Sequence, residues 1–158
     1  MLESWTTISV LAGITTRIKL GTLVTGVIYR YPSILAKIGA TLDVLSKGRL
    51  FLGIGASWNE EESLAYGIGE STNNNGNSKG PARISFPSNK ERLLRLEEAL
   101  QIIRKMWTEE SSASFEGKYY QVKDSNLYTK PKQQIPICVA GLGAQGVALL
   151  DAEAVLLV

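Results

Sequence analysis

Residues 17–57 predict a strand, a helix and a second strand, and this unit constrains the fold more than any other stretch. The mostly apolar run at 18–25 is rich in β-branched side chains, which is typical of a strand buried on both faces. Pro32 suits the first turn of a helix, and Gly48 ends the helical pattern. Residues 50–55 predict a second buried strand. Because one helix joins them, the two strands are expected to be parallel neighbours in an α/β fold. The apolar residues at helical spacing between them are Ile34, Leu35, Ile38, Leu42 and Leu45.

Glycines and small hydroxyl residues follow both predicted strands. In parallel α/β units, ligands bind beyond the carboxyl ends of the strands. The sequence therefore predicts a ligand site at this edge, and its candidate residues are Leu23, Val24, Thr25, Gly26, Gly55, Ala56 and Ser57.

Composition narrows the classes of function. The net charge is +2, 20% of the residues are charged and no basic run occurs, so we expect neither nucleic acid nor an acidic membrane as a partner. No apolar stretch approaches the roughly 20 residues of a membrane helix, which predicts a cytoplasmic protein. The chain has no histidine and its acids do not gather at ligand spacing, which excludes a His-based triad and a conventional zinc site. Cys138 lies in an apolar run and is interpreted as a small buried hydrophobe.

Three segments around this unit have simple interpretations. Residues 2–15 place apolar side chains on one side of a helix, which would pack on the strand that follows. The consecutive side chains of Glu60, Glu61 and Glu62 would point in different directions on a helix, so they cannot converge on one metal ion. Their negative charge instead indicates the first turn of a short helix, where it is stabilising. Residues 69–85 contain four Asn, three Gly and three Ser, which predicts a flexible polar insert.

The most clearly patterned helix follows Ser88, which can form a capping box with Glu91. Its core-facing stripe is Leu93, Leu96, Leu100, Ile103 and Trp107. Its charged residues are interpreted as a solvated side, made of Arg92, Arg95, Glu97, Glu98, Arg104 and Lys105. Residues 113–122 then predict a hairpin that turns near Glu116 and Gly117. Packing within the hairpin is the favoured interpretation of Tyr119 and Tyr120, and the border of a pocket is the alternative.

Residues 137–140 predict a short buried strand, followed by Gly141, Gly143 and Gly146 at a spacing that dinucleotide-binding proteins share. A nicotinamide-binding Rossmann domain stays open as an alternative, although its fingerprint also needs a further strand and an acid about 20 residues on. Under either interpretation, glycines at a strand end let backbone amides at a helix start face a phosphate.

Long segments of the chain, in order and with their spacing kept, resemble one family. They are TTRIKLGTLVTG, YRYPSILAKIGATLDVLSKGRLFLGIGASWNEEE, AYGI and FPSNKERLLRLEEALQIIRKMWTEE. They look like the bacterial luciferase-like monooxygenase family, with the greatest similarity to its deazaflavin (coenzyme F-420) dependent oxidoreductase branch. The similarity covers nearly all of residues 3–68 and 86–141.

The resemblance implies a (β/α)8 barrel of the TIM type that binds FMN or coenzyme F-420 at the carboxyl ends of its strands. It implies a bulge with a non-proline cis peptide behind the cofactor ring at Leu23 and Val24. It implies that the cofactor-facing end of the next strand consists of Gly55, Ala56 and Ser57. It also implies a phosphate loop that consists of Ala140, Gly141, Leu142 and Gly143.

Set against the family pattern, the first two strands and the last strands are absent, unless residues 154–158 begin the sixth. We therefore expect a partial barrel with about half of the strands, forming a single domain over residues 1–158 and representing a central fragment. The protein is expected to be an oxidoreductase that depends on a flavin or on coenzyme F-420. It would transfer hydride to or from a small molecule, or oxygenate that molecule. We also expect a homo-oligomer. No residue is assigned as its acid or base. The alternative is a non-catalytic, flavin-binding or self-associating half barrel.

Overall fold

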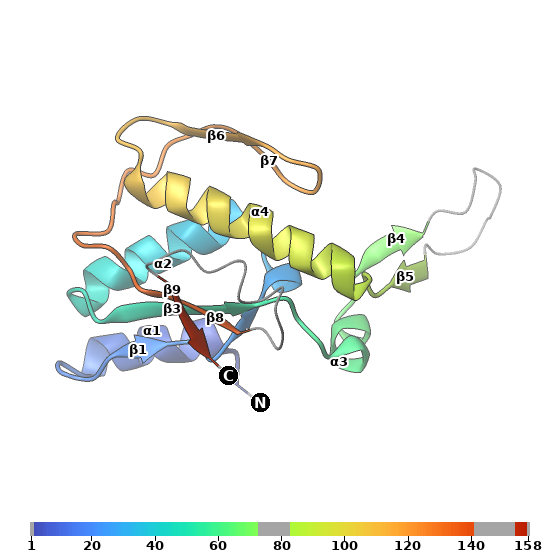
Figure 1. Cartoon of the computed structure of the whole chain (residues 1–158). Helices are drawn as coiled ribbons and strands as arrows, with labels where there is room; N and C mark the ends of the chain where they lie inside the picture. Colours follow the sequence, from blue (N-terminus) through green and yellow to red (C-terminus); the bar gives the residue numbers. More distant parts are fainter. Residues whose placement is uncertain (1, 73–82, 141–153, 158) are drawn as a thin grey trace.

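The computed structural model describes residues 2–72, 83–140 and 154–157. Within these ranges a parallel sheet runs through the centre of the molecule (Figure 1). Its strands are β1 (Leu20–Gly21), β2 (Thr25–Gly26), β3 (Leu50–Gly55), β8 (Ile137–Ala140) and β9 (Ala154–Leu157). The strand order is β1-β3-β8-β9, and β2 also pairs with β3. The predicted parallel strands at 50–55 and 137–140 are confirmed, and β9 is a further parallel strand beside β8.

The first predicted strand, residues 18–25, is wrong as one continuous element. The structure divides it into β1 and β2, and the peptide bond between Leu23 and Val24 is cis. The cis bond lies where the family resemblance implied it.

The register of the strands explains this division. Gly21 pairs with Phe51, whereas Thr25 pairs with Ile54. Four steps along the first strand therefore match three steps along β3, which defines a β-bulge. Hydrophobic pattern does not reveal an extra residue of this kind, because the run stays apolar through the bulge.

Helix α2 (Pro32–Ser46) begins and ends as predicted. Pro32 occupies its first turn, where the missing N–H group has no helical partner to lose. Lys47 follows in the left-handed conformation with φ of 59°, and Gly48 has φ of 80°. Their N–H groups donate to carbonyls in the last turn of the helix, which closes its C-terminus.

The buried face of α2 differs from the apolar spacing in the sequence. Ile34 and Leu45 are 53% and 64% exposed, and the helix buries a face that contains small residues. At Gly39, an added Cβ atom would lie 3.0 Å from the ring of Trp107. Close approach of the helix that carries Trp107 therefore requires a small residue here. Leu35 and Leu42 of the predicted stripe are buried, whereas Ile34 and Leu45 turn outward.

Three long helices accompany the sheet: α1 (Ser4–Ile14), α2 and α4 (Asn89–Thr108). Helix α2 packs against both α1 and α4, and α2 and α4 lie side by side in Figure 1. None of the described helices is long and apolar enough to cross a membrane. Strands and helices close around one core, whose least exposed apolar side chains are Ala36, Ala40, Leu50, Leu52, Ile54, Leu96, Ala99, Ile102, Ile103 and Val139.

A hairpin of β6 (Ala113–Glu116) and β7 (Gln121–Ser125) lies along α4, and the predicted hairpin is confirmed (Figure 1). The predicted solvated side of α4 is wrong for Arg92, Arg95 and Glu98. The carboxylate of Glu98 accepts hydrogen bonds from the backbone N–H groups of residues 118–120 at 2.8, 2.9 and 3.0 Å. The guanidinium of Arg95 lies 4.7 Å from the centroid of the Tyr119 ring. Arg95 and Glu98 appear solvated in the sequence because the hairpin that covers them comes later in the chain. Arg92 instead donates to the distant carbonyl of Ser57.

Two short elements follow the strand ends. The 3-10 helix η1 (Val27–Tyr29) follows β2, and α3 (Glu60–Ala65) follows β3. The side chain of Asn59 caps α3 by accepting from the Glu62 N–H group, so the three consecutive acids lie in a first turn as predicted. The described residues contain no cluster of metal-ligating side chains.

The polar insert at 69–85 contains two strands at its margins. β4 (Glu70–Thr72) and β5 (Arg83–Ser85) pair in antiparallel fashion, whereas residues 73–82 lie outside the described ranges. The sequence did not predict this ladder, because each strand has only three residues, too few to show a strand pattern.

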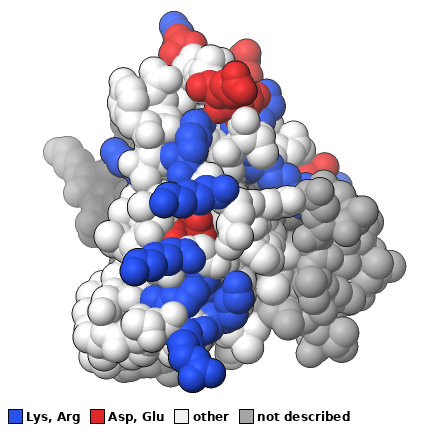
Figure 2. All heavy atoms as spheres, turned by 90° about the vertical axis from the view of Figure 1, so that its left-hand side faces the viewer, with Lys and Arg blue, Asp and Glu red and all other residues white. Residues whose placement is uncertain are grey.

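Positive charge gathers where the strands begin. Figure 2 shows Lys and Arg side chains following one another along this face. Lys19 donates to the carbonyl of Gly48 at 3.4 Å, and Lys130 donates to that of Met106 at 2.8 Å. Helices that alternate with parallel strands end at this edge, and cations are stabilising at helix C-termini. The cations in the loops that precede β1, β3 and β8 are Arg17, Lys19, Lys47, Arg49, Lys130 and Lys132.

Glu3 caps the amino end of α1. Its carboxylate accepts hydrogen bonds from the backbone N–H groups of Trp5 at 3.1 Å and Thr6 at 2.7 Å, and it pairs with Arg30 at 2.6 Å. Burial alone would raise the pKa of Glu3. The bonds from Thr6 and Trp5 and the charge of Arg30 outweigh burial and hold the pKa at about 2.

We expect Glu3→Ala to lower the free energy of unfolding by about 1 kcal/mol at neutral pH, the usual cost of losing a helix cap. The folded-state pKa lies below the ordinary value of 4.5, so this stabilisation is complete above that pH and is lost as the pH falls toward 2. Urea unfolding over this range should show the two proteins converging. Glu97→Ala, which removes an exposed acid of α4, is the control and should stay at the wild-type value. A constant gap across the range would contradict the role of Glu3.

Candidate functional site

The predicted candidate residues of three strands meet at the carboxyl edge of the sheet. Gly26 at the end of β2 pairs with Gly55 of β3, and Gly55 pairs with Ala140 of β8. The candidate residues from segments more than 80 positions apart therefore lie in one row across the sheet. Two exposed apolar side chains accompany this edge: Leu23 is 76% exposed and Trp58 is 84% exposed.

The row has no bulky side chain at its centre. An added Cβ atom at Gly55 would lie 3.1 Å from a methyl group of Val24 and 3.3 Å from the carbonyl oxygen of Ala140. A side chain at this position would press on the bulge and on β8, so glycine allows these segments to approach one another closely.

The side chain of Thr25, a predicted site residue, points into the core and not toward the ligand edge. Its hydroxyl is buried, accepts a hydrogen bond from Trp5 Nε1 at 2.8 Å and donates to the Thr22 hydroxyl at 2.9 Å. The Thr22 hydroxyl in turn donates to the carbonyl of Gly53 at 2.8 Å. This buried relay ties α1, the bulge and β3 together. The side chain of Thr25 thus supports the edge from inside the core.

Ser57 ends the row in an unusual state. Its φ is 67°, and its buried Oγ atom has no hydrogen-bond partner among the described residues. The Oγ atom fills the space beside Gly26, where an added Cβ atom would lie 2.4 Å away. Its carbonyl oxygen accepts a hydrogen bond from Arg92 Nε at 3.1 Å. A buried hydroxyl without a partner is uncommon, and it marks this turn as an unusual point of the edge.

The proposed phosphate loop is described only in part. Ala140 belongs to β8, whereas Gly141, Leu142 and Gly143 lie outside the described residues. Cys138 of β8 is half-buried, and burial raises the pKa of its thiol, which agrees with a packing role.

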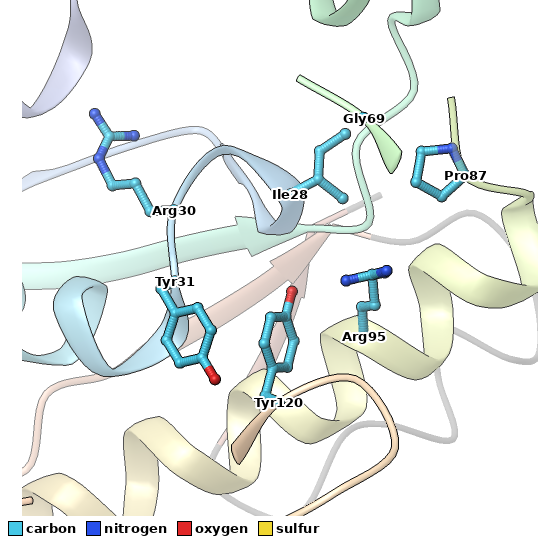
Figure 3. A pocket seen from close by; sticks show the side chains of 7 residues that line it. All are labelled: Ile28, Arg30, Tyr31, Gly69, Pro87, Arg95 and Tyr120. Carbon is cyan, nitrogen blue, oxygen red and sulfur yellow. The ribbon is translucent and has the colours of Figure 1, made fainter. Parts of the chain in front are cut away.

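A cavity of about 530 Å³ opens between η1, the hairpin and α4 (Figure 3). Tyr120 and Arg95 point into it from the hairpin and from α4. Burial raises the pKa of Tyr120, and its contact with Arg95 partly offsets this effect. Arg95 also pairs with Glu91 at 2.7 Å, so its charge is already balanced. The sequence interpretation favoured packing of Tyr120 in the hairpin and left a pocket border as the alternative. The structure supports the alternative for Tyr120, because this residue lines the cavity. The other lining residues are Ile28, Arg30, Tyr31, Gly69 and Pro87.

The fold and the site define a parallel α/β protein whose candidate ligand site lies at the carboxyl ends of its strands. The sequence profile of the family described as luciferase-like monooxygenase matches residues 1–155. The chain therefore belongs to this family.

Curated relatives carry more specific names. The chain is 38% identical over 130 residues to the F420-dependent glucose-6-phosphate dehydrogenase of Kineococcus radiotolerans, which covers 82% of this chain and 33% of the relative. It is 37% identical over 131 residues to the enzyme of the same name from Segniliparus rotundus, with coverage of 82% and 34%. The chain thus spans about one third of the length of these relatives.

Solved structures show the same fold. An F420-dependent secondary alcohol dehydrogenase in complex with an F420-acetone adduct superposes with a TM-score of 0.76 at 25% identity, covering 97% of this chain and 42% of that one. The coenzyme F420 dependent tetrahydromethanopterin reductase of Methanopyrus kandleri gives a TM-score of 0.69 at 23% identity, with coverage of 90% and 40%. The latter likeness is one of fold alone.

Proposed function

We propose that this chain carries part of the cofactor site of a luciferase-like oxidoreductase that uses coenzyme F-420 or FMN. Its sheet would form part of a (β/α)8 barrel in a single domain, as a central portion of a longer cytoplasmic protein. The observation that carries the proposal is the row of Gly26, Gly55 and Ala140 beside the bulge at Leu23 and Val24. Both the resemblance and the names of the relatives favour coenzyme F-420.

The bound cofactor would supply the hydride chemistry, and the chain would hold and orient it. Leu23 and Val24 would lie behind the ring, and Gly55 with Ala56 would let it approach the backbone. Ser57 would border the cofactor at the end of the row. Ala140, with Gly141, Leu142 and Gly143, would hold the phosphate. The substrate would be a small molecule, and we assign no acid or base within the described residues.

The alternative is a non-catalytic, flavin-binding or self-associating half barrel. Exposed apolar residues on α1 and α2 favour self-association, because a second copy would remove them from water. They are Val10, Ile14, Ile34 and Leu45. We therefore propose a homo-oligomer, and sedimentation analysis distinguishes it from a monomer.

The proposal is tested by titrating the purified chain with coenzyme F-420 and with FMN while recording ligand fluorescence. We expect saturable binding, and we expect Leu23→Glu to weaken it at least tenfold, because a carboxylate beside an apolar ring loses its hydration. Leu23 is 76% exposed, so the substitution should leave the fold intact. Tyr128→Glu is the control: Tyr128 is 93% exposed and lies in the segment that precedes β8, away from the carboxyl ends of the strands.

The outcomes separate the two functions. Binding of either cofactor together with oxidation or reduction of a small molecule supports the enzyme. Binding without turnover by a self-associated chain supports the half barrel. Wild-type protein that binds neither cofactor, or a Leu23→Glu variant that binds as tightly as Tyr128→Glu, counts against the proposed site.

A further inference from the structure

Arg92 joins three segments of the chain at the edge of the candidate site. Its Nε donates to the carbonyl of Ser57 at 3.1 Å, one Nη donates to the carbonyl of Pro87, and the other reaches the side chain of Asn89 at 3.5 Å. The guanidinium carbon also lies 4.3 Å from the centroid of the Phe86 ring. One cation therefore links the end of β3, the residues after β5 and the first turn of α4.

Ser57 needs such a support. A non-glycine residue with φ of 67° lies in the left-handed region, which side chains disfavour. Its own hydroxyl has no partner among the described residues, so it does not compensate. The hydrogen bond from Arg92 to its carbonyl is a tertiary contact that favours this conformation.

The conformation of Ser57 sets the direction of the next residue. Trp58 is 84% exposed, although the buried strand β3 ends at Gly55, only three residues earlier. An indole in this place adds a large apolar surface to the edge where the cofactor would lie. If the backbone at Ser57 relaxed to the usual region, the peptide plane would rotate and Trp58 would leave its present direction.

We propose that Arg92 is a positioning residue for this site: it holds the turn at Ser57 and thereby the indole of Trp58, and it couples both to Phe86 and Pro87 at the base of the β4–β5 ladder. The consequence for cofactor binding depends on the proposed function, whereas the consequence for Trp58 does not. Lysine cannot replace arginine here, because one ammonium group lacks the planar fork that reaches several acceptors while stacking on a ring.

The test compares Arg92→Lys with Arg95→Lys in the full chain. Both arginines lie on α4, one turn apart, and each stacks on an aromatic ring, at 4.3 Å for Phe86 and 4.7 Å for Tyr119. Arg95 contacts the hairpin and Glu91, whereas Arg92 reaches the end of β3. The pair therefore separates a general loss of packing from a specific loss at Ser57.

Two readouts are measured. Acrylamide quenching reports mainly on Trp58, because Trp5 is 3% exposed and Trp107 is partly buried. We expect Arg92→Lys to change the quenching constant by about twofold and to weaken coenzyme F-420 or FMN binding about tenfold. We expect Arg95→Lys to match wild type in both readouts, even where thermal unfolding shows that it is the less stable variant.

The results have distinct meanings. If wild-type chain binds neither cofactor, the proposed function fails, and the quenching comparison alone decides the role of Arg92. Unchanged quenching in Arg92→Lys overturns the inference. Equal changes in Arg95→Lys also overturn it, because the effect would then be general loss of packing.

Discussion

Gly53→Ala is expected to lower the free energy of unfolding by about 3 kcal/mol, or to prevent folding altogether. An added Cβ atom at this position would lie 1.9 Å from the carbonyl oxygen of Thr22. That contact is with backbone and not with a flexible side chain, so neither partner moves away easily. The carbonyl also belongs to the bulge beside the candidate site. Relief of the clash would have to displace the strand edge itself.

Gly13→Ala is the matched control for this substitution. Gly13 lies inside α1, and nothing stands within 4 Å of an added Cβ atom there. Alanine should stabilise the helix by up to about 1 kcal/mol. Urea unfolding followed by circular dichroism measures both variants. Similar stabilities for Gly53→Ala and Gly13→Ala would show that the bulge does not press on β3.

Arg49→Lys is expected to lower the free energy of unfolding by about 3 kcal/mol. The five N–H groups of Arg49 donate to five acceptors, namely the carbonyls of Ala12, Thr15, Ile18 and Ser46 and the hydroxyl of Thr15, at 2.7 to 3.0 Å. A lysine keeps the charge and loses most of these bonds, which leaves helix-end carbonyls unpaired. The loss separates α1 from the loop before β3.

Arg17→Lys provides the comparison for Arg49→Lys. Arg17 lies in the same basic face and is exposed, so lysine should serve equally well. Thermal unfolding of both variants measures the difference. If Arg49→Lys unfolds at the temperature of Arg17→Lys, the basic face is better explained by contacts outside the chain than by support of helix ends.

The sequence could predict the site residues that lie at the carboxyl ends of the parallel strands. Parallel strands bring their carboxyl ends to one edge, so Gly55 and Ala140 were both expected at that edge. Their direct pairing is a finding of the structure. The hydroxyl of Thr25 was not predictable in the same way. Its burial depends on Trp5, which reaches it from a helix 20 residues earlier. No local pattern encodes such a contact.

The sequence by itself determined the local elements and the family. Pro32 and Gly48 delimit α2, the apolar run at 50–55 forms β3, and the ordered motifs identify a luciferase-like chain. These signals are short in range, because caps and side-chain periodicity act within a few residues. Tertiary structure alone decided which charged side chains form hydrogen bonds within the fold. Arg49, Arg92 and Glu98 are residue types that are usually solvated. Each supports the fold because the tertiary structure brings distant backbone carbonyls or N–H groups within hydrogen-bond distance of its side chain.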